Sequence, residues 1–280
     1  MLHSPGVLCP RCARGLVVHS ERPVTACSCG QLFRLDDNIL FLSKPEDLEQ
    51  IPEAAARNRE AGSYLQLPKF PTQIASLRCF VEALPPPLTA FPALDLGCGP
   101  GPTTGMLLDK GYSVVAVDFS AASLRINAKA NAKHRSRVIY VAADLNDLRV
   151  CNAKYGVLMM ADFLQHLGTL EAQNRFISNT VPALVPGGMF YLSCFNYNIK
   201  NILKNDRTGA FRDGAMPGAI RYRRSQVSEV LAMLPSEVET MAVCPMNVFH
   251  GATADRLATK LPFSFFLARM IVVIGRRRSV

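Results

Sequence analysis

Apolar runs of strand length alternate with helix-period segments through the middle of the chain. The apolar runs lie at 93–96, 112–117, 138–142, 155–160 and 189–193, and the helical segments lie at 103–110, 121–133 and 170–184. Alternating strands and helices predict parallel β-α-β units, because consecutive parallel strands need a crossover between them. The pattern therefore predicts an α/β domain whose ligands bind beyond the carboxyl ends of the strands.

A glycine loop follows the first of these strands. Gly97, Gly99 and Gly101 let backbone N–H groups approach a ligand closely, since no Cβ blocks the way. Pro102 suits the first turn of the next helix, where a missing N–H costs nothing. A dinucleotide loop would have a small residue at that position, and the triphosphate loop G-x-x-x-x-G-K-[ST] does not occur in the sequence. The loop thus argues against a dinucleotide enzyme and against a nucleotide triphosphatase.

Carboxylates stand at or near the ends of four predicted strands, at Asp95, Asp118, Asp144 and Asp162. Asp118 lies about 20 residues after Gly97, where an α/β nucleotide site places a carboxylate for ribose hydroxyls. Each aspartate alone is equally consistent with a helix cap or a turn residue. Their occurrence together, in one order along the chain, favours a ligand site.

The order D-L-G-C-G-P-G, V-D-F-S, A-A-D-L and L-V-P-G-G resembles the class I S-adenosylmethionine-dependent methyltransferases. The resemblance covers roughly residues 70–280 and is strong up to residue 195. It implies a Rossmann-like, seven-stranded, mostly parallel sheet with helices on both faces, in a domain spanning 91–280. It also implies S-adenosyl-L-methionine as the cofactor.

The same resemblance implies roles for individual residues. The loop at 97–101 would wrap the methionine part of the cofactor, Asp118 would bind the ribose hydroxyls, and Asp144 with Leu145 would lie against the adenine. Carboxylates suit these positions, because they accept hydrogen bonds from hydroxyls and exocyclic amines. The predicted cofactor-binding set is Asp95, Gly97, Cys98, Gly99, Asp118, Phe119, Asp144, Leu145 and Ala161.

His166 follows the fourth predicted strand and is the candidate catalytic base. An imidazole titrates near neutrality and can take a proton from a hydroxyl or amine acceptor. The alternative is a structural histidine that caps a helix or packs under the sheet. Substrate contacts are expected from helices within 53–83 and from an insert at 196–224, with Tyr64, Asn196, Tyr197 and Tyr222 as candidates. The insert's Gly209, Gly214 and Gly218 favour a mobile flap over a regular element.

Four cysteines near the amino terminus form two close pairs, Cys9 with Cys12 and Cys27 with Cys29. Paired thiols at two turns are typical of a tetrahedral zinc site, and four thiolates leave no open position, so the metal would be structural. The C-x-C spacing of the second pair is shorter than usual; the alternative is four unliganded thiols. The following residues resemble the zinc-ribbon modules fused to some methyltransferases. We therefore predict a zinc ribbon at 1–43, with a linker and helices at 44–90.

Charge and hydropathy add the remaining constraints. The net charge is +9, and from residue 198 onward thirteen Lys and Arg face six Asp and Glu. This basic surface allows an RNA substrate, although a solvated helix face is the commoner explanation. The apolar stretch 263–275 is too short to span a membrane, so we expect an antiparallel strand there, with peripheral membrane contact as the alternative. The first residues do not resemble a secretion signal, which favours a cytoplasmic protein with free thiols.

Three functions remain open. The first is methylation of an oxygen, nitrogen or carbon atom of a small biosynthetic molecule by S-adenosylmethionine. The second is methylation of a ribosomal RNA base, in which the ribbon and the basic surface would contact phosphates. The third is a non-catalytic, cofactor-binding scaffold whose ribbon docks a partner protein. The sequence ranks them in that order and gives no oligomeric state.

Overall fold

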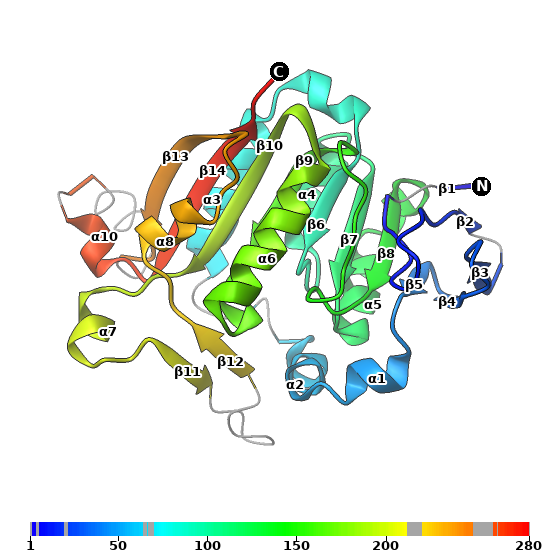
Figure 1. Cartoon of the computed structure of the whole chain (residues 1–280), viewed down its shortest axis with the longest axis horizontal. Coiled ribbons are helices and arrows are strands. Elements are labelled where there is room, and N and C mark those ends of the chain that lie inside the picture. Colours follow the sequence, from blue (N-terminus) through cyan, green and yellow to red (C-terminus); the bar gives the residue numbers. More distant parts are fainter. Residues whose placement is uncertain are drawn as a thin grey trace.

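The computed structural model describes residues 2–3, 6–19, 22–63, 66, 70–211, 220–248, 260–261 and 263–279 (Figure 1). A ten-stranded sheet runs through the molecule in the order β13-β14-β10-β9-β6-β7-β8-β5-β4-β3. Its strands are β3 Val24–Ala26, β4 Leu32–Asp36, β5 Ile39–Phe41, β6 Ala93–Leu96, β7 Val114–Asp118, β8 Val138–Ala142, β9 Tyr155–Ala161, β10 Leu184–Phe195, β13 Val238–Met246 and β14 Met270–Arg277. Two short pairs lie outside this sheet, β1 Leu2–His3 with β2 Val18–His19, and β11 Thr208–Phe211 with β12 Ile220–Arg223.

Strand direction divides the sheet into three parts. Six adjacent strands in the middle of the sheet run parallel to one another, in the order β5, β8, β7, β6, β9 and β10. Strand β14 runs antiparallel to both β10 and β13 at one end, and β4 runs antiparallel to both β5 and β3 at the other. The strands from β13 to β8 form the predicted Rossmann-like, mostly parallel sheet of seven.

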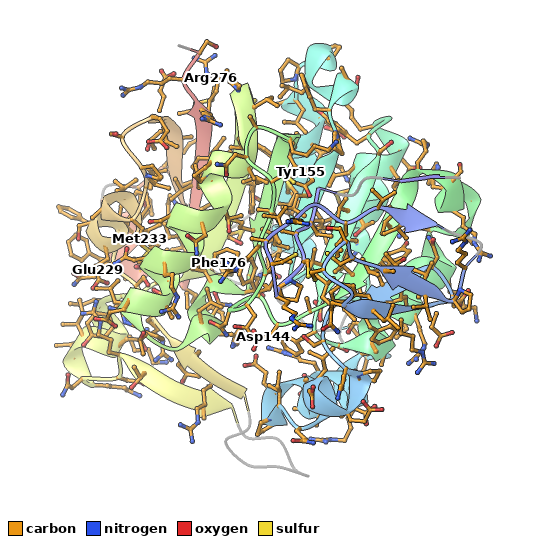
Figure 2. The ribbon with its side chains drawn as sticks, turned by 45° about the vertical axis from the view of Figure 1, so that its right-hand side comes forward. Asp144, Tyr155, Phe176, Glu229, Met233 and Arg276 are labelled. Atoms are coloured by element: carbon orange, nitrogen blue, oxygen red, sulfur yellow. The ribbon has the colours of Figure 1, made fainter. Side chains whose placement is uncertain are left out.

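Helices cover both faces of the sheet, as predicted. They are α1 Pro45–Glu49, α2 Pro52–Glu60, α3 Phe70–Ala83, α4 Pro102–Asp109, α5 Ala121–Ala130, α6 Leu170–Thr180, α7 Ile199–Leu203, α8 Val227–Ala232 and α10 Ser264–Leu267. Leu77 of α3, Leu107 of α4 and Leu124 of α5 pack in one apolar layer. Phe176 of α6 and Met233, which follows α8, belong to the layer on the opposite face (Figure 2).

Side-chain alternation along the central strands explains the two layers. Leu94 and Leu96 of β6 belong to the layer that contains Phe176, whereas Ala93 belongs to the layer that contains Leu77. All four residues of β6 are buried. A strand covered by helices on both sides must be apolar on both sides, which is why it appears in the sequence as a continuous apolar run. Asp95 is the exception to this rule.

Three predicted boundaries lie three or more residues from the observed ones. Helix α5 ends at Ala130 rather than at residue 133, and a separate 3-10 segment, Ala132–Arg137, follows it. Helix α6 stops at Thr180, because Pro182 cannot continue an α-helical hydrogen-bond ladder. Strand β10 starts at Leu184 rather than 189; its pairing with β9 shifts register between Leu184 and Met189, where Gly187 has a φ of 80°.

The cysteine-bearing amino-terminal segment continues the central sheet. Strand β5 pairs in parallel with β8, and the side chain of Asn38 donates a hydrogen bond to the carbonyl of Val138 at 2.9 Å. The predicted boundary at residue 43 falls between the end of β5 and the start of α1. The division of the chain into three units stays a prediction, and we refer to residues 1–43 as the cysteine module.

The carboxyl-terminal part contains the expected antiparallel strand. It is β14, which lies between β10 and β13, and the short helix α10 precedes it. The insert at 196–224 is more regular than predicted, since it contains α7, β11 and β12; Gly209 lies on β11, whereas Gly214 and Gly218 fall outside the described residues. Among the helices that the structure describes, none is both long enough and apolar enough to cross a membrane.

Candidate active site

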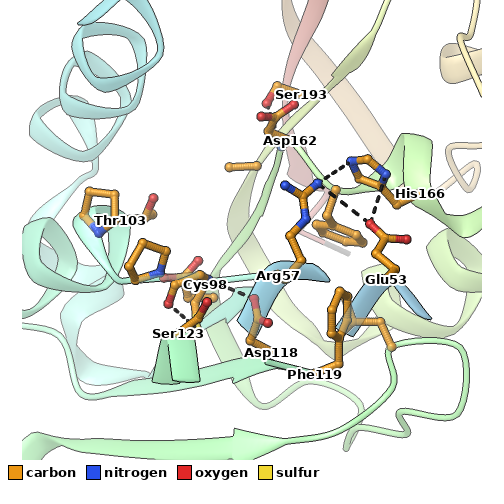
Figure 3. A pocket seen from close by; sticks show the side chains of 18 of the residues that line it. Glu53, Arg57, Cys98, Thr103, Asp118, Phe119, Ser123, Asp162, His166 and Ser193 are labelled. Atoms are coloured by element: carbon orange, nitrogen blue, oxygen red, sulfur yellow. Dashed lines mark hydrogen bonds and ion pairs between the residues drawn. The ribbon is translucent and has the colours of Figure 1, made fainter. Parts of the chain in front are cut away.

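A cavity of about 240 Å³ opens at the carboxyl ends of the parallel strands. The glycine loop after β6, the ends of β7 and β9, the turn after β8 and helix α2 line it (Figure 3). Every residue of the predicted cofactor set lines this cavity, and so does His166: Asp95, Gly97, Cys98, Gly99, Asp118, Phe119, Asp144, Leu145 and Ala161. The structure therefore brings the sequence-predicted residues together at one place.

The glycine loop needs glycine for steric reasons at two positions. Gly97 has a φ of 65°, and a Cβ there would lie 2.9 Å from the ring of Phe163. Gly101 has a φ of 99°, and a Cβ there would overlap the side chain of Asn127. Gly99, by contrast, has no heavy atom within 4 Å of where a Cβ would stand. A ligand can therefore approach this side of Gly99 closely.

Asp118 connects the glycine loop to the second core strand. Its Oδ2 accepts a hydrogen bond from the N–H of Gly99 at 2.9 Å, and its Oδ1 accepts one from the N–H of Ser120 at 2.8 Å. Burial raises the pKa of the Asp118 carboxyl above its ordinary value, while these backbone donors act in the opposite direction. Backbone donors of this kind favour the ionised form, which can accept further hydrogen bonds from ligand hydroxyls.

Asp95 supports the loop from within the sheet. Its Oδ2 accepts a 2.7 Å hydrogen bond from the hydroxyl of Thr104, and Asn127 donates both to that hydroxyl and to the carbonyl of Gly99. Burial raises the pKa of Asp95 to about 7, since only 1% of the residue is exposed. This network joins β6, α4 and α5 behind the loop and holds its backbone in place.

Asp144 and Leu145 occupy the turn that follows β8. The Oδ1 atom of Asp144 accepts a hydrogen bond from the N–H of Asn146 at 2.9 Å, which closes a tight side-chain turn. The N–H of Ala143 donates to the carbonyl of Asp118 at 3.1 Å, so the turn is attached to the end of β7. Leu145 is buried, and Asn146 also lines the cavity.

Two lining residues that the sequence did not predict come from helix α2. Glu53 Oε1 lies 3.2 Å from Nδ1 of His166, and Arg57 Nη2 lies 3.3 Å from Nε2 of the same ring (Figure 3). The neighbouring Asn58 accepts hydrogen bonds from the Ser120 hydroxyl and the Ala122 N–H, at 2.7 and 3.2 Å. Helix α2 therefore contacts the residues that follow two different strands, His166 after β9 and Ser120 after β7. Periodicity could not reveal this, because Arg57 and His166 are 109 positions apart.

The contacts of His166 constrain how it can act. An arginine only donates hydrogen bonds, so the Nε2 atom that faces Arg57 is an acceptor. The proton is then on Nδ1, which lies 2.7 Å from the carbonyl oxygen of Arg221. Both ring nitrogens are engaged in this arrangement. A role for His166 as a base, which stays a prediction, requires release of the Arg57 contact first.

Replacing Glu53 by glutamine is expected to change how stability depends on pH. Burial raises the pKa of Glu53 from 4.5 to about 7, and Arg57 opposes the shift. Between pH 4.5 and 7, a carboxyl with such a raised pKa binds more protons in the folded protein than in the unfolded chain. Its stabilising contribution is therefore fully present below about pH 4.5 and is lost as the pH rises to 7. From pH 5 to 8, the free energy of unfolding of the wild type should fall by about 1–3 kcal/mol relative to Glu53→Gln.

Urea unfolding at pH 5, 6, 7 and 8 measures this difference. The matched control is Glu49→Gln, which alters an exposed carboxylate on the neighbouring helix α1. A difference between wild type and Glu53→Gln that stays constant over this pH range would contradict the expected titration.

Asp162 has a strained backbone at the mouth of the cavity. Its φ is 60°, a value rare for a residue with a side chain. The N–H of Asp162 donates to the carbonyl and to the hydroxyl of Ser193, both at 3.1 Å, and Gln165 donates to its Oδ1 at 2.8 Å. Asp162 and Ser193 both line the cavity (Figure 3). Strain maintained by surrounding hydrogen bonds is common at ligand sites.

The predicted helices within 53–83 do contribute to the cavity, for example through Glu53 and Leu77, whereas three candidates of the insert are not among its lining residues: Asn196, Tyr197 and Tyr222. The buried side chain of Asn196 donates to the carbonyls of Phe265 and Ala268, at 2.6 and 2.9 Å, so it is structural. Tyr197 lies against the guanidinium of Arg207, and Tyr222 packs on the ring of Phe195. The sequence placed these residues correctly in an insert but could not show which way they point. Tyr64 falls outside the described residues.

The four amino-terminal cysteines form a cluster whose sulfur atoms all lie within 4.8 Å of one another. The Cys9 and Cys29 sulfurs are 3.8 Å apart, and those of Cys12 and Cys27 are 3.5 Å apart. Zinc–sulfur bonds of about 2.3 Å in a tetrahedron place sulfurs about 3.8 Å apart, so the arrangement fits this metal. Gly30, with a φ of 84°, completes the short second turn.

Comparisons with known proteins agree with the fold and the motifs. A model of a methyltransferase-domain family matches residues 93–188. The ubiquinone biosynthesis O-methyltransferase of Methylobacterium nodulans is 24% identical over 150 residues, 51% of this chain and 59% of that protein. The chain spans about half the length of the curated relatives it matches.

Solved structures share the fold. The 1,6-didemethyltoxoflavin-N1-methyltransferase of Burkholderia thailandensis has a TM-score of 0.57 at 16% identity, covering 92% of this chain and 100% of that one. An S-adenosylmethionine-dependent methyltransferase of Mesorhizobium loti has a TM-score of 0.56 at 19% identity, covering 75% and 98%. The family match assigns residues 93–188 to a methyltransferase domain, and the solved structures share its fold.

Proposed function

We propose that this protein transfers a methyl group from S-adenosylmethionine to an oxygen, nitrogen or carbon atom of a small molecule. The observation that carries the proposal is the convergence of the glycine loop, Asp118 and the Asp144–Leu145 turn on one cavity, which α2 covers. Such a cavity is the usual form of a small-molecule site.

The residues of the cavity fit the cofactor. The space beside Gly99 leaves room for a ligand, the carboxylate of Asp118 offers hydrogen-bond acceptors to ribose hydroxyls, and buried carboxylates suit a ligand that carries positive charge. When bound, the cofactor supplies an activated methyl group on a positively charged sulfur. The protein then has to orient the acceptor and exclude water, which can contribute several kcal/mol to catalysis. Helix α2, attached through His166 and Ser120, provides the cover.

The remaining cavity wall is suited to a partly apolar acceptor. Ile51, Leu77 and Leu167 provide apolar surface, and Tyr191 and Ser193 provide hydroxyl groups. The hydroxyl of Tyr191 lies 3.0 Å from that of Ser76, which fixes its direction. The curated relatives are named O-methyltransferases of ubiquinone biosynthesis, so hydroxyl acceptors are the first class to test.

Ion pairs in the basic carboxyl-terminal runs weaken the case for the RNA alternative. Three arginines of the basic carboxyl-terminal runs have carboxylate partners: Arg223 with Glu229 at 2.9 Å, Arg224 with Asp206 at 2.8 Å, and Arg276 with Glu239 at 2.8 Å. Paired arginines contribute less to phosphate binding than unpaired ones. The cytoplasmic location stays a prediction, as does the scaffold function.

For the cysteine cluster we propose one structural zinc ion. Four thiolates would fill its tetrahedral coordination, leaving no position for a water or a substrate. The metal would then supply folding energy to a segment too small to be stabilised by apolar burial alone.

Transfer of radiolabelled methyl groups into separated metabolite and RNA pools tests the function. We expect label in the metabolite pool, and none with a variant carrying Asp118→Ala. Label in RNA alone would replace the small-molecule assignment by the RNA one. Cofactor binding without label in either pool would favour the scaffold.

A further inference from the structure

The segment between β8 and β9 carries the cavity residues Asp144 and Leu145. After these two residues, it is hydrogen-bonded to the cysteine module. The N–H of Leu8 donates to the carbonyl of Arg149 at 2.9 Å, and the N–H of Cys151 donates to the carbonyl of Gly6 at 2.8 Å. Val7 and Val150 form an antiparallel bridge between these two bonds. Residues 6–8 and 149–151 thus form a short two-stranded contact.

The same segment is also held upstream of its cavity residues. Strand β5 pairs with β8 up to Phe41 opposite Ala142, and the N–H of Leu42 donates to the carbonyl of Ala142 at 3.0 Å. Both ends of the 143–151 segment are therefore attached to the cysteine module. Between the two attachments lie Asp144 and Leu145, which line the cavity.

Apolar packing joins the cysteine cluster to this segment. Val7 and Cys9 are fully buried, and both belong to the same apolar cluster as Leu145 and Val150. Cys9 is also one of the four clustered thiols, and its N–H donates to the carbonyl of Arg14 to close the first turn. The contact with residues 149–151 thus begins at Leu8, the residue next to the clustered thiol of Cys9.

We propose that the metal in the cysteine cluster controls cofactor affinity, because the metal-stabilised turn holds the 143–151 segment in its binding position. The inference rests on the proposed function, since it assigns that segment to the cofactor's adenosine. Residues 143–151 contain no helix or strand of their own, so their position depends on what they contact. Loss of the metal would free the 6–8 contact and leave the core sheet and its helices folded.

Gly6→Ala separates this contact from metal binding. Gly6 has a φ of 78°, and a Cβ there would lie 2.7 Å from the Tyr155 hydroxyl and 2.8 Å from Cγ of Lys154. The substitution should push residues 6–8 away from 149–151 while all four thiols remain. Gly15→Ala is the matched control in the same module, because no heavy atom lies within 4 Å of its Cβ position.

Calorimetric titration with S-adenosylhomocysteine, together with zinc analysis, tests the proposal on the full chain. We expect one zinc per chain in the wild type and both variants. The dissociation constant should rise about tenfold or more in Gly6→Ala, and also in wild-type protein stripped of zinc by a chelator, whereas Gly15→Ala stays near the wild type. Far-ultraviolet circular dichroism confirms that the core remains folded in each sample.

The outcomes separate this inference from the function itself. Wild-type affinity in both zinc-free protein and Gly6→Ala would overturn the inference and leave the function standing. No binding to the zinc-loaded wild type would overturn the function. If Gly6→Ala loses zinc or fails to fold, Val150→Ala takes its place, because it removes buried apolar contact from the Val150 side of the same bridge. Unchanged cofactor affinity in Val150→Ala would also overturn the inference.

Discussion

Replacing Asp118 by alanine is expected to raise the dissociation constant for S-adenosylhomocysteine about 100-fold or more. The substitution removes the acceptor for ligand hydroxyls and also the two bonds from the N–H groups of Gly99 and Ser120. Hydrogen bonds to a charged group contribute about 1.5–3 kcal/mol each, and a buried donor left without a partner adds to the loss. The glycine loop loses its attachment to β7 at the same time.

Isothermal titration measures this change, with Asp109→Ala as the matched control. Asp109 is an exposed carboxylate at the end of α4, on the same domain, and it pairs with Lys133 and His134. The control should bind like the wild type. Asp118→Asn separates the contribution of the charge from that of the hydrogen-bond acceptor, because asparagine keeps an acceptor oxygen but carries no charge. Wild-type affinity in Asp118→Ala would remove Asp118 from the binding site.

Replacing Cys9 by alanine is expected to abolish zinc binding and unfold the cysteine module. Cys9 is fully buried, and its sulfur lies 3.8 Å from that of Cys29. Three remaining thiolates cannot complete the proposed tetrahedral site, and the module would lose the folding energy that the metal is proposed to supply. We expect a loss of at least about 3 kcal/mol in the stability of this module.

Metal analysis and limited proteolysis check this expectation. The variant should contain far less than one zinc per chain and should be cleaved within residues 1–43 much faster than the wild type. Cys79→Ala is the control, since Cys79 is exposed on α3, far in sequence from the cluster. Full zinc occupancy in Cys9→Ala would rule Cys9 out as a required ligand.

The cavity residues that the sequence predicted share one property: each lies within a few positions of a strand end. Gly97 and Gly99 follow β6, Phe119 follows β7, and Leu145 lies three residues after β8. In a parallel sheet these ends lie at one edge, so locating the strands also locates the residues. Five core strands and the antiparallel β14 were predicted from their apolar runs, whereas the number of seven came from the family resemblance and β13 was not located in the sequence.

What the sequence did not predict depends on contacts between distant residues. Glu53 and Arg57 reach the cavity only because α2 crosses it, and nothing in their own helix indicates that direction. The extension of the sheet by β5 depends on pairing with β8, about 100 residues later. The 12-residue strand β10 was predicted too short, because Gly187 and Gly188 resemble a turn, whereas they lie at an irregularity within the strand.

The contacts of His166 with α2 favour the structural alternative for this histidine over a base. Glu53 and Arg57 contact opposite nitrogens of the ring, so the histidine links the cover of the cavity to the end of β9. The pH-dependent stability expected for Glu53 concerns the same link.

The central claim is that the cavity at the strand ends binds S-adenosylmethionine. Calorimetric titration of the zinc-loaded wild type with S-adenosylmethionine and with S-adenosylhomocysteine tests it most directly. We predict saturable binding of one molecule of either compound per chain, lost in Asp118→Ala and retained in Asp109→Ala. Absence of heat for both compounds with folded, zinc-loaded protein would contradict the claim.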